Sequence, residues 1–140
     1  MSITRTQSVK APAGVRAPWT TELMAAGAAV AAGLLGWLLL VPLGGIEIAA
    51  NMGGAVKTVG ALDIAITAFG AGVIGLLALR VLERLTARAL TVWTVVAVAV
   101  LAVSFVGPAM AVSTPAMWAL VGLHVLVAGA VIAVGRWSRR

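Results

Sequence analysis

The sequence predicts an all-α fold: an integral membrane, four-helix up-down bundle with both termini on the cytoplasmic side. Hydrophobic residues make up 62% of its 140 residues and charged residues only 10%, whereas soluble domains are about a quarter charged. Uncharged runs at residues 23–46, 64–79 and 89–135 are long, and the last contains one ionisable side chain, His124. All lysines and arginines except Lys57 fall on one side of the membrane that these runs predict.

The four spans follow from the lengths of these runs. A helix rises about 1.5 Å per residue and the hydrocarbon core is about 30 Å thick, so one span needs roughly 20 residues. The run 89–135 is long enough for two spans, with the turn marked by Gly107-Pro108 and Thr114-Pro115 because proline disfavours helix. Residues 22–43, 60–80, 89–108 and 116–135 are the expected spans, and short connections make successive spans antiparallel.

The flanking segments predict the orientation. A basic leader, residues 1–19, precedes the membrane domain at 20–136, and a basic tail, residues 137–140, follows it. The positive-inside rule places both in the cytoplasm and the protein in the cytoplasmic (inner) membrane. The first apolar run exceeds the 7–15 residues, roughly, of a signal-peptide core, so we expect it to be retained as a span.

Tryptophan gives a second indication, because indole rings prefer the membrane boundary. Trp19, Trp93 and Trp137 fall at predicted inner ends, and Trp37 and Trp118 fall near outer ends.

Small residues are expected to hold the spans together, because close backbone approach drives helix association in lipid. They form possible ridges in three spans: Ala25, Ala29, Ala32, Gly33 and Gly36; Ala68, Gly72 and Gly75; and Gly122, Gly129 and Ala133. In the fourth span His124 lies opposite its ridge, so an inward ridge would turn His124 toward another neighbour, a second protomer or a polar cavity. At the start of the first span, Thr20 or Thr21 is expected to cap the helix and Glu22 to favour its dipole.

Composition also excludes several classes of function. The chain has no cysteine, which excludes disulfides, thiolate nucleophiles and Cys-ligated zinc. One histidine without ligand spacing predicts no metal, and no cofactor is expected. The net charge of +6 is concentrated in the flanks, which indicates topology and contact with anionic membrane lipids rather than nucleic acid.

Ionisable residues in the outer half of the membrane are the candidates for chemistry. Asp63, His124 and Glu47 are the candidate catalytic residues, with Asp63 and His124 as acid and base, because intramembrane ionisable groups are functional candidates. Candidate substrate-binding residues are Asn51, Thr67, Ser104, Trp37 and Trp118.

Structural explanations compete with these roles. Asp63 can instead cap or anchor the outer end of its span, paired with Lys57. His124 can be a neutral imidazole bonded to a backbone carbonyl, to Ser104 or to Thr94.

The connection between the first two spans, residues 44–60, carries two Gly-Gly pairs around an apolar segment. Non-helical backbone within a membrane must be buried in protein or line a water-filled cavity. A short interfacial helix or re-entrant lid would satisfy this, and a flexible outside loop with glycine turns is the alternative.

Several short motifs resemble a known family. They are the Leu-Glu-Arg segment within 79–88, the Val-Trp-Thr at 92–94, the segment 104–108, the His-x-x-x-x-Gly stretch within 123–132, and the glycine-rich first loop. Over about residues 22–135 the chain resembles an uncharacterised actinobacterial four-span membrane family, the domain of unknown function number six thousand and sixty-nine. The resemblance implies a four-helix inner-membrane protein and supplies no activity.

Three functional hypotheses remain open. The first is a non-catalytic or auxiliary protein that binds a lipophilic small molecule or a membrane-protein partner, in addition to membrane lipids. The second is a cofactor-independent membrane enzyme of cyclase, isomerase or oxygenase type acting on a polyketide, isoprenoid or lipid, and the third is a homo-oligomeric proton-coupled carrier. An enzyme needs both ionisable groups in the wall of one pocket, and a carrier needs a path across the membrane.

Overall fold

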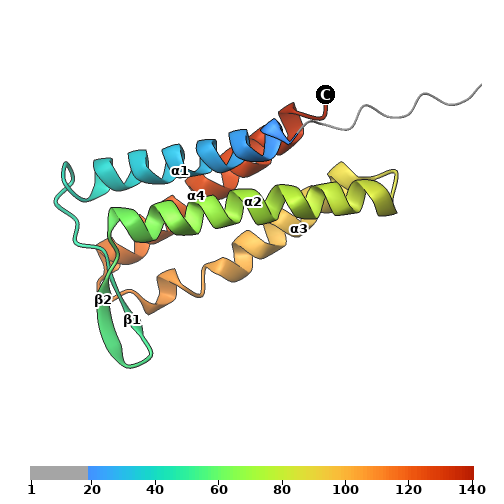
Figure 1. Ribbon diagram of the computed structural model, residues 1–140. Coiled ribbons are helices and arrows are strands. Elements are labelled where there is room, and N and C mark those ends of the chain that lie inside the picture. Colours follow the sequence, from blue (N-terminus) through green and yellow to red (C-terminus); the bar gives the residue numbers. More distant parts are fainter. Residues whose placement is uncertain (1–18) are drawn as a thin grey trace, which may run out of the picture.

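Four long helices and a two-stranded hairpin make up the computed structural model, which describes residues 19–140 (Figure 1). The elements are α1 Thr20–Leu40, β1 Ala49–Met52, β2 Ala55–Thr58, α2 Ala61–Leu85, α3 Ala89–Ser104, the 3-10 helix η1 Pro108–Met110 and α4 Thr114–Trp137. Four segments are long and apolar enough to cross a membrane, the third being α3 continued through η1 to Met110. The predicted all-α, four-span fold is confirmed; the basic leader lies outside the described residues except for Trp19.

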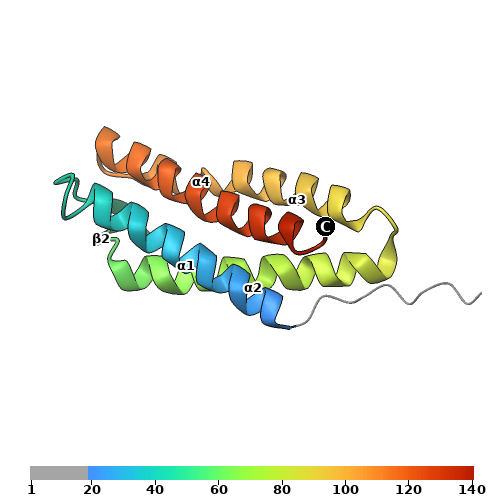
Figure 2. The same cartoon turned by 90° about the horizontal axis from the view of Figure 1, so that it is seen from above.

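The helices run up and down, so that the hairpin lies at one end and the start of α1 and the end of α4 lie at the other (Figures 1 and 2). The most extensive contacts of α1 are with α2 and α4. By contrast, the buried residues of α3 are Ala89 and Trp93, both near its beginning. From there α3 diverges from α2 toward the hairpin end (Figure 1).

Several helix ends differ from the predicted bounds, and α1 ends at Leu40 rather than at residue 43. α2 continues to Leu85, and α3 stops at Ser104, before Gly107-Pro108. α4 already begins at Thr114, because Ser113 caps it by accepting a hydrogen bond of 3.3 Å from the amide of Ala116. The prediction that Thr114-Pro115 belongs to the turn is therefore wrong: proline is tolerated in a first helical turn, where its missing N–H would have no partner.

The start of α1 also departs from expectation. Trp19 occupies the N-cap position and no side chain caps the helix, so neither Thr20 nor Thr21 is the cap. Both threonines lie within the helix, and Thr21 and Glu22 are buried. The reason is tertiary packing: the Trp19 ring covers the guanidinium of Arg80 on α2, with Cζ 4.2 Å from the ring centroid.

Glycines bring α1 and α2 into close contact. A Cβ atom placed on Gly72 would lie 2.6 Å from Cα of Ala26, so the two backbones touch. Gly33 faces Ile64 and Ala68 of α2 in the same contact. Small residues are the ones that permit such an approach in a bilayer.

The ridge on α4 faces the other way. A Cβ added to Gly122 or Gly129 would meet no other atom of the described chain within 4 Å, while Leu120, Leu123 and Val131 are buried. α4 therefore presents its larger side chains to the bundle, and His124, opposite the glycines, faces inward.

Residues 44–60 form neither the expected interfacial helix nor a loose loop. β1 and β2 pair antiparallel, from Ala49 opposite Thr58 to Met52 opposite Ala55. Gly53 and Gly54 connect them with φ values of +61° and +90°, as required at both central positions of a type I′ turn. The amide of Val112 donates to the carbonyl of Ala49 at 3.1 Å, which ties the hairpin to the connection between α3 and α4.

Candidate functional site

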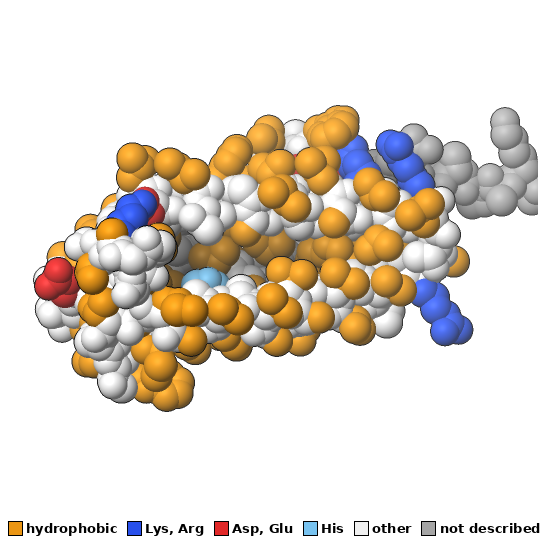
Figure 3. Space-filling model, turned by 90° about the horizontal axis from the view of Figure 1, so that it is seen from below, with side chains coloured by type: hydrophobic (Ala, Val, Ile, Leu, Met, Phe, Trp, Pro, Cys, Tyr) orange, Lys and Arg blue, Asp and Glu red, His pale blue; other side chains and the backbone are white. Residues whose placement is uncertain are grey.

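A cavity of about 700 Å³ lies between α2, α3 and α4 beneath the hairpin. It exists because α3 diverges from α2 and because the facing side chains of α2 are small, among them Ala71, Gly75 and Ala78. Figure 3 shows the hollow from its open side, between α2 and α3, with the pale blue side chain of the single histidine inside it. α4 closes the back of the cavity.

The two ends of the cavity differ in polarity. Polar side chains gather in the half nearer the hairpin: Lys57, Asp63, Thr67, Ser104 and His124. Leu82, Val131 and Ile132 line the far half, together with Trp93. From Asp63 to Leu82 the α2 wall spans about 28 Å, close to the thickness of the hydrocarbon core.

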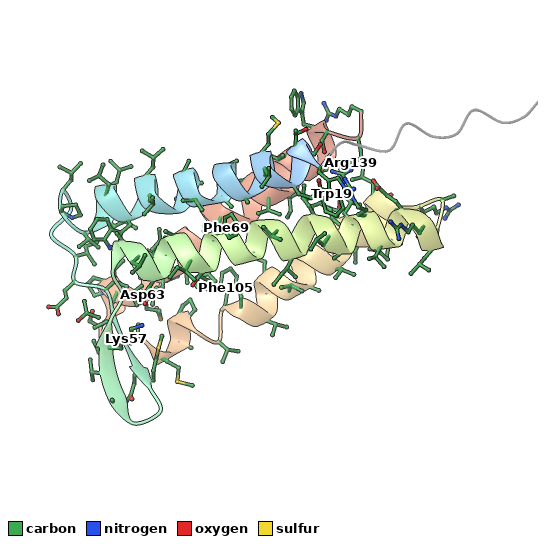
Figure 4. The ribbon with its side chains drawn as sticks, in the orientation of Figure 1. Trp19, Lys57, Asp63, Phe69, Phe105 and Arg139 are labelled. Atoms are coloured by element: carbon green, nitrogen blue, oxygen red, sulfur yellow. The ribbon has the colours of Figure 1, made fainter. Side chains whose placement is uncertain are left out.

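Asp63 sits at the mouth of the cavity, in the first turn of α2. Its Oδ1 accepts a hydrogen bond of 2.6 Å from Nζ of Lys57, and its Oδ2 accepts one of 3.0 Å from the amide of Gly60 (Figure 4). The side chain is 39% exposed. Both oxygens thus stabilise the junction between β2 and α2, an arrangement that the sequence offered as the structural alternative for this residue.

His124 lies deeper, on α4. Its Nδ1 is 2.7 Å from the carbonyl oxygen of Leu120; because a carbonyl can only accept, Nδ1 carries a proton and donates it. In the neutral ring Nε2 is then an acceptor, and no hydrogen-bond partner for it occurs within residues 19–140. The ring of Phe105 meets the imidazole edge-on, with centroids 6.5 Å apart.

Neither hydroxyl proposed as a partner of His124 bonds to it. Ser104 donates to the carbonyl of Leu101 and Thr94 to that of Leu90, both at 2.7 Å. Each of these hydroxyl groups donates instead to a backbone carbonyl of its own helix.

Two further polar groups in the wall are also bonded within the protein. Thr67 Oγ1 donates to the carbonyl of Asp63 at 2.7 Å. Trp93, 2% exposed, donates from Nε1 to the carbonyl of Gly75 at 2.6 Å. Trp93 was expected at the membrane boundary; it is at the predicted end of its span but buried, because this bond and the packing of α2 draw its ring inward.

The structure brings four of the predicted site residues together and leaves the others apart. Asp63, Thr67, Ser104 and His124 all line the cavity. Glu47 and Asn51 are exposed and do not line it, and Trp118 is 64% exposed on the outside of α4. Trp37 packs against the core around Ile48 and Leu120 and does not line the cavity.

A charge cluster at the opposite end of the bundle was not predicted from the sequence. Glu22 Oε1 lies 2.8 Å from Nη2 of Arg80 and 3.9 Å from Nη2 of Arg139, and Arg139 also bonds Glu83 at 2.9 Å. Glu22 is buried. The cluster joins α1, α2 and the segment that follows α4. Its signal in the sequence was a carboxylate at the start of one span and arginines at the corresponding ends of two others.

No group of three metal-ligating side chains occurs in the part of the chain that the structure describes. What the cavity offers instead is a long apolar space with hydrogen-bonding groups at one end. A family model described as a family of unknown function, DUF6069, matches residues 13–140. No curated protein and no solved structure matches the chain.

Proposed function

Because the chain belongs to the DUF6069 family, whose function is unknown, we propose a role from its structure: this small multi-pass membrane protein binds a lipophilic molecule in the cavity between α2, α3 and α4. The observation that carries the proposal is the cavity itself. Its volume of about 700 Å³ falls within the 300–1,000 Å³, approximately, of ligand pockets.

The shape and polarity of the cavity support an elongated amphiphile. The apolar stretch from Ala68 to Leu82 along α2 would contact a hydrocarbon tail, and the polar groups near the hairpin would contact a head group. Since the cavity opens sideways between α2 and α3, such a molecule can enter from the bilayer without crossing water.

The proposal includes an orientation in the cytoplasmic membrane with both termini in the cytoplasm. Within residues 19–140, all six arginines lie at the end opposite the hairpin, and the one lysine, Lys57, lies in the hairpin. Positive residues flank cytoplasmic ends, so the hairpin faces the periplasmic or outer side.

A second candidate is a cofactor-independent enzyme, favoured by the presence of Asp63 and His124 in the wall of the same cavity. Binding without chemistry is the better supported function, because both oxygens of Asp63 already hold the junction of β2 with α2. To act as an acid or base, the Asp63 carboxylate would have to give up its bonds to Lys57 and to the amide of Gly60, which would leave Lys57 without its ion pair.

Filling the cavity tests the proposed function. Ala97 of α3 lines the cavity, whereas Ala99, two residues further, faces the outer surface of the same helix. We expect native mass spectrometry of the purified protein to show one hexadecanol bound to the wild type and to Ala99→Phe, and none to Ala97→Phe. Equal occupancy of the two variants, or none in the wild type, would refute binding in this cavity.

A further inference from the structure

The cavity wall is short of hydrogen-bond donors. We infer that the bound molecule is a neutral long-chain alcohol, whose hydroxyl donates a hydrogen bond to the wall; this inference rests on the proposed function. The inference follows from the acceptors to which the polar side chains of the wall already donate their hydrogen bonds.

Three polar side chains reach the cavity from three different helices, and all three donate to the backbone of their own helix. Thr67 donates to the carbonyl of Asp63, Ser104 to that of Leu101 and His124 to that of Leu120, each at 2.7 Å. A hydroxyl keeps two acceptor lone pairs, and a neutral imidazole keeps one on its second nitrogen. Toward the cavity these groups are therefore acceptors.

The remaining donors of the wall are occupied or lie at its mouth. Trp93 has one N–H, which the carbonyl of Gly75 accepts at 2.6 Å. Lys57 is bound to Asp63 at 2.6 Å, and its side chain is 55% exposed at the hairpin. It therefore lies outside the part of the cavity that the head group would occupy when the hydrocarbon tail fills the apolar end.

This imbalance discriminates among head groups. An ether, ester or ketone only accepts, so burial beside these residues would leave it unpaired unless an intrahelical bond broke, and unpaired buried polar groups are costly. A hydroxyl donates to any of the three acceptors. A cationic head would lack a counter-charge, because Asp63, the acid of the wall, is already neutralised by Lys57.

The positions of the acceptors also orient the molecule. Thr67 lies in the second turn of α2, Ser104 ends α3, and His124 lies about 15 Å from the start of α4, so all three lie in the half nearer the hairpin. The hydroxyl is placed there, and the tail runs toward Leu82 and Trp93.

A matched pair of probes tests the inference: hexadecanol and hexadecyl methyl ether, which share a tail and an oxygen and differ in the O–H proton. In competition, read by native mass spectrometry of the full-length protein, the wild type should retain the alcohol about tenfold better, the preference that one hydrogen bond supplies. His124→Phe preserves an aromatic ring and should reduce the preference severalfold, and Thr67→Val should reduce it further. Thr94→Val removes the same kind of intrahelical bond outside the cavity and should leave the preference unchanged.

The outcomes separate this inference from the function on which it rests. Equal binding of alcohol and ether, or tighter binding of hexadecyltrimethylammonium, would overturn the inference while leaving lipophilic binding intact. Binding of none of the three probes would overturn the proposed function itself. A tenfold preference that survives in the triple variant His124→Phe, Thr67→Val, Ser104→Ala would place the head group elsewhere and would also overturn the inference.

Discussion

Adding one methyl group at Gly72 should separate α1 from α2. In Gly72→Ala the new Cβ would lie 2.6 Å from Cα and 3.0 Å from N of Ala26, and 3.2 Å from the carbonyl oxygen of Ala25. Carbon atoms pack at about 3.5–4.0 Å, so the helices must move apart by roughly 1 Å. Backbone atoms cannot turn aside as a flexible side chain can, and α1 must shift as a body.

The cost of this shift can be bounded. Overpacking of this kind costs about 1–3 kcal/mol, and replacing glycine by alanine within a helix returns about 1 kcal/mol. We therefore expect a net loss of up to about 2 kcal/mol in the free energy of unfolding, which is about 1–3 kcal/mol less stable than a glycine-to-alanine change without overpacking. Gly36 of α1 packs against α4, because its Cβ position lies 2.8 Å from Leu123. The shift of α1 away from α2 should therefore also loosen the contact between α1 and α4.

The assay is unfolding by SDS in mixed micelles, followed by circular dichroism. Gly70 provides the matched control, because it lies on the same helix and nothing occupies the 4 Å around its Cβ position within the described chain. Gly70→Ala should be neutral or stabilising. If Gly72→Ala and Gly70→Ala unfold with the same free energy, the proposed backbone contact does not limit the approach of the two helices.

Three further predictions concern the two ends of the bundle. Glu22→Gln should lower the free energy of unfolding by about 3 kcal/mol, because it removes the charge of the buried carboxylate that the half-buried guanidinium of Arg80 faces at 2.8 Å; a double-mutant cycle with Arg80→Gln should show a coupling above about 0.5 kcal/mol, and additivity would argue against the ion pair. Gly54→Val should strain the hairpin by about 1–3 kcal/mol, because φ is +90° there; hydrogen exchange of the β1 and β2 amides should accelerate relative to Ala55→Val, and unchanged exchange would refute the turn geometry. A cysteine introduced as Asn51→Cys should react with an impermeant maleimide from outside intact cells, and labelling only after permeabilisation would reverse the proposed orientation.

The number and order of the spans were predictable because they depend on coarse quantities. Uncharged runs long enough to cross the hydrocarbon core, together with the proline-marked connection between the third and fourth spans, determine where helices can lie. The ends were less predictable: the capping of α4 by Ser113 and the extension of α2 to Leu85 depend on individual hydrogen bonds and neighbours.

The hairpin was missed although a signal for it was present. The pair Gly53-Gly54 is typical of a two-residue type I′ turn between two strands. The strands that it joins, β1 and β2, end at Met52 and begin at Ala55. Strands of four residues carry too little alternation to be recognised, and the surrounding membrane favoured a helical interpretation. Their stability comes from docking, since Ile48 and Ala50 are buried against the bundle.

Of the eight candidate site residues, four line the cavity and four do not, and the catalytic and binding roles assigned to them stay predictions. Counting residues along the spans placed Asp63 near one membrane boundary and His124 close to the midplane, and both line the cavity together with Thr67 and Ser104. Counting could not reveal which partners their protons and oxygens already have. Likewise, Glu22 has a sufficient local explanation in the helix dipole, so its pairing with Arg80 becomes visible only when α1 and α2 are placed side by side.

For the ligand proposed above, the sideways opening between α2 and α3 would determine what the occupancy of the cavity depends on. A guest that exchanges through this opening equilibrates with the surrounding lipid, so the relevant dose is its mole fraction in the bilayer rather than its molarity in water. Dilution of the cells would then leave the protein loaded, whereas synthesis of new phospholipid, or extraction of the guest by another membrane component, would empty it.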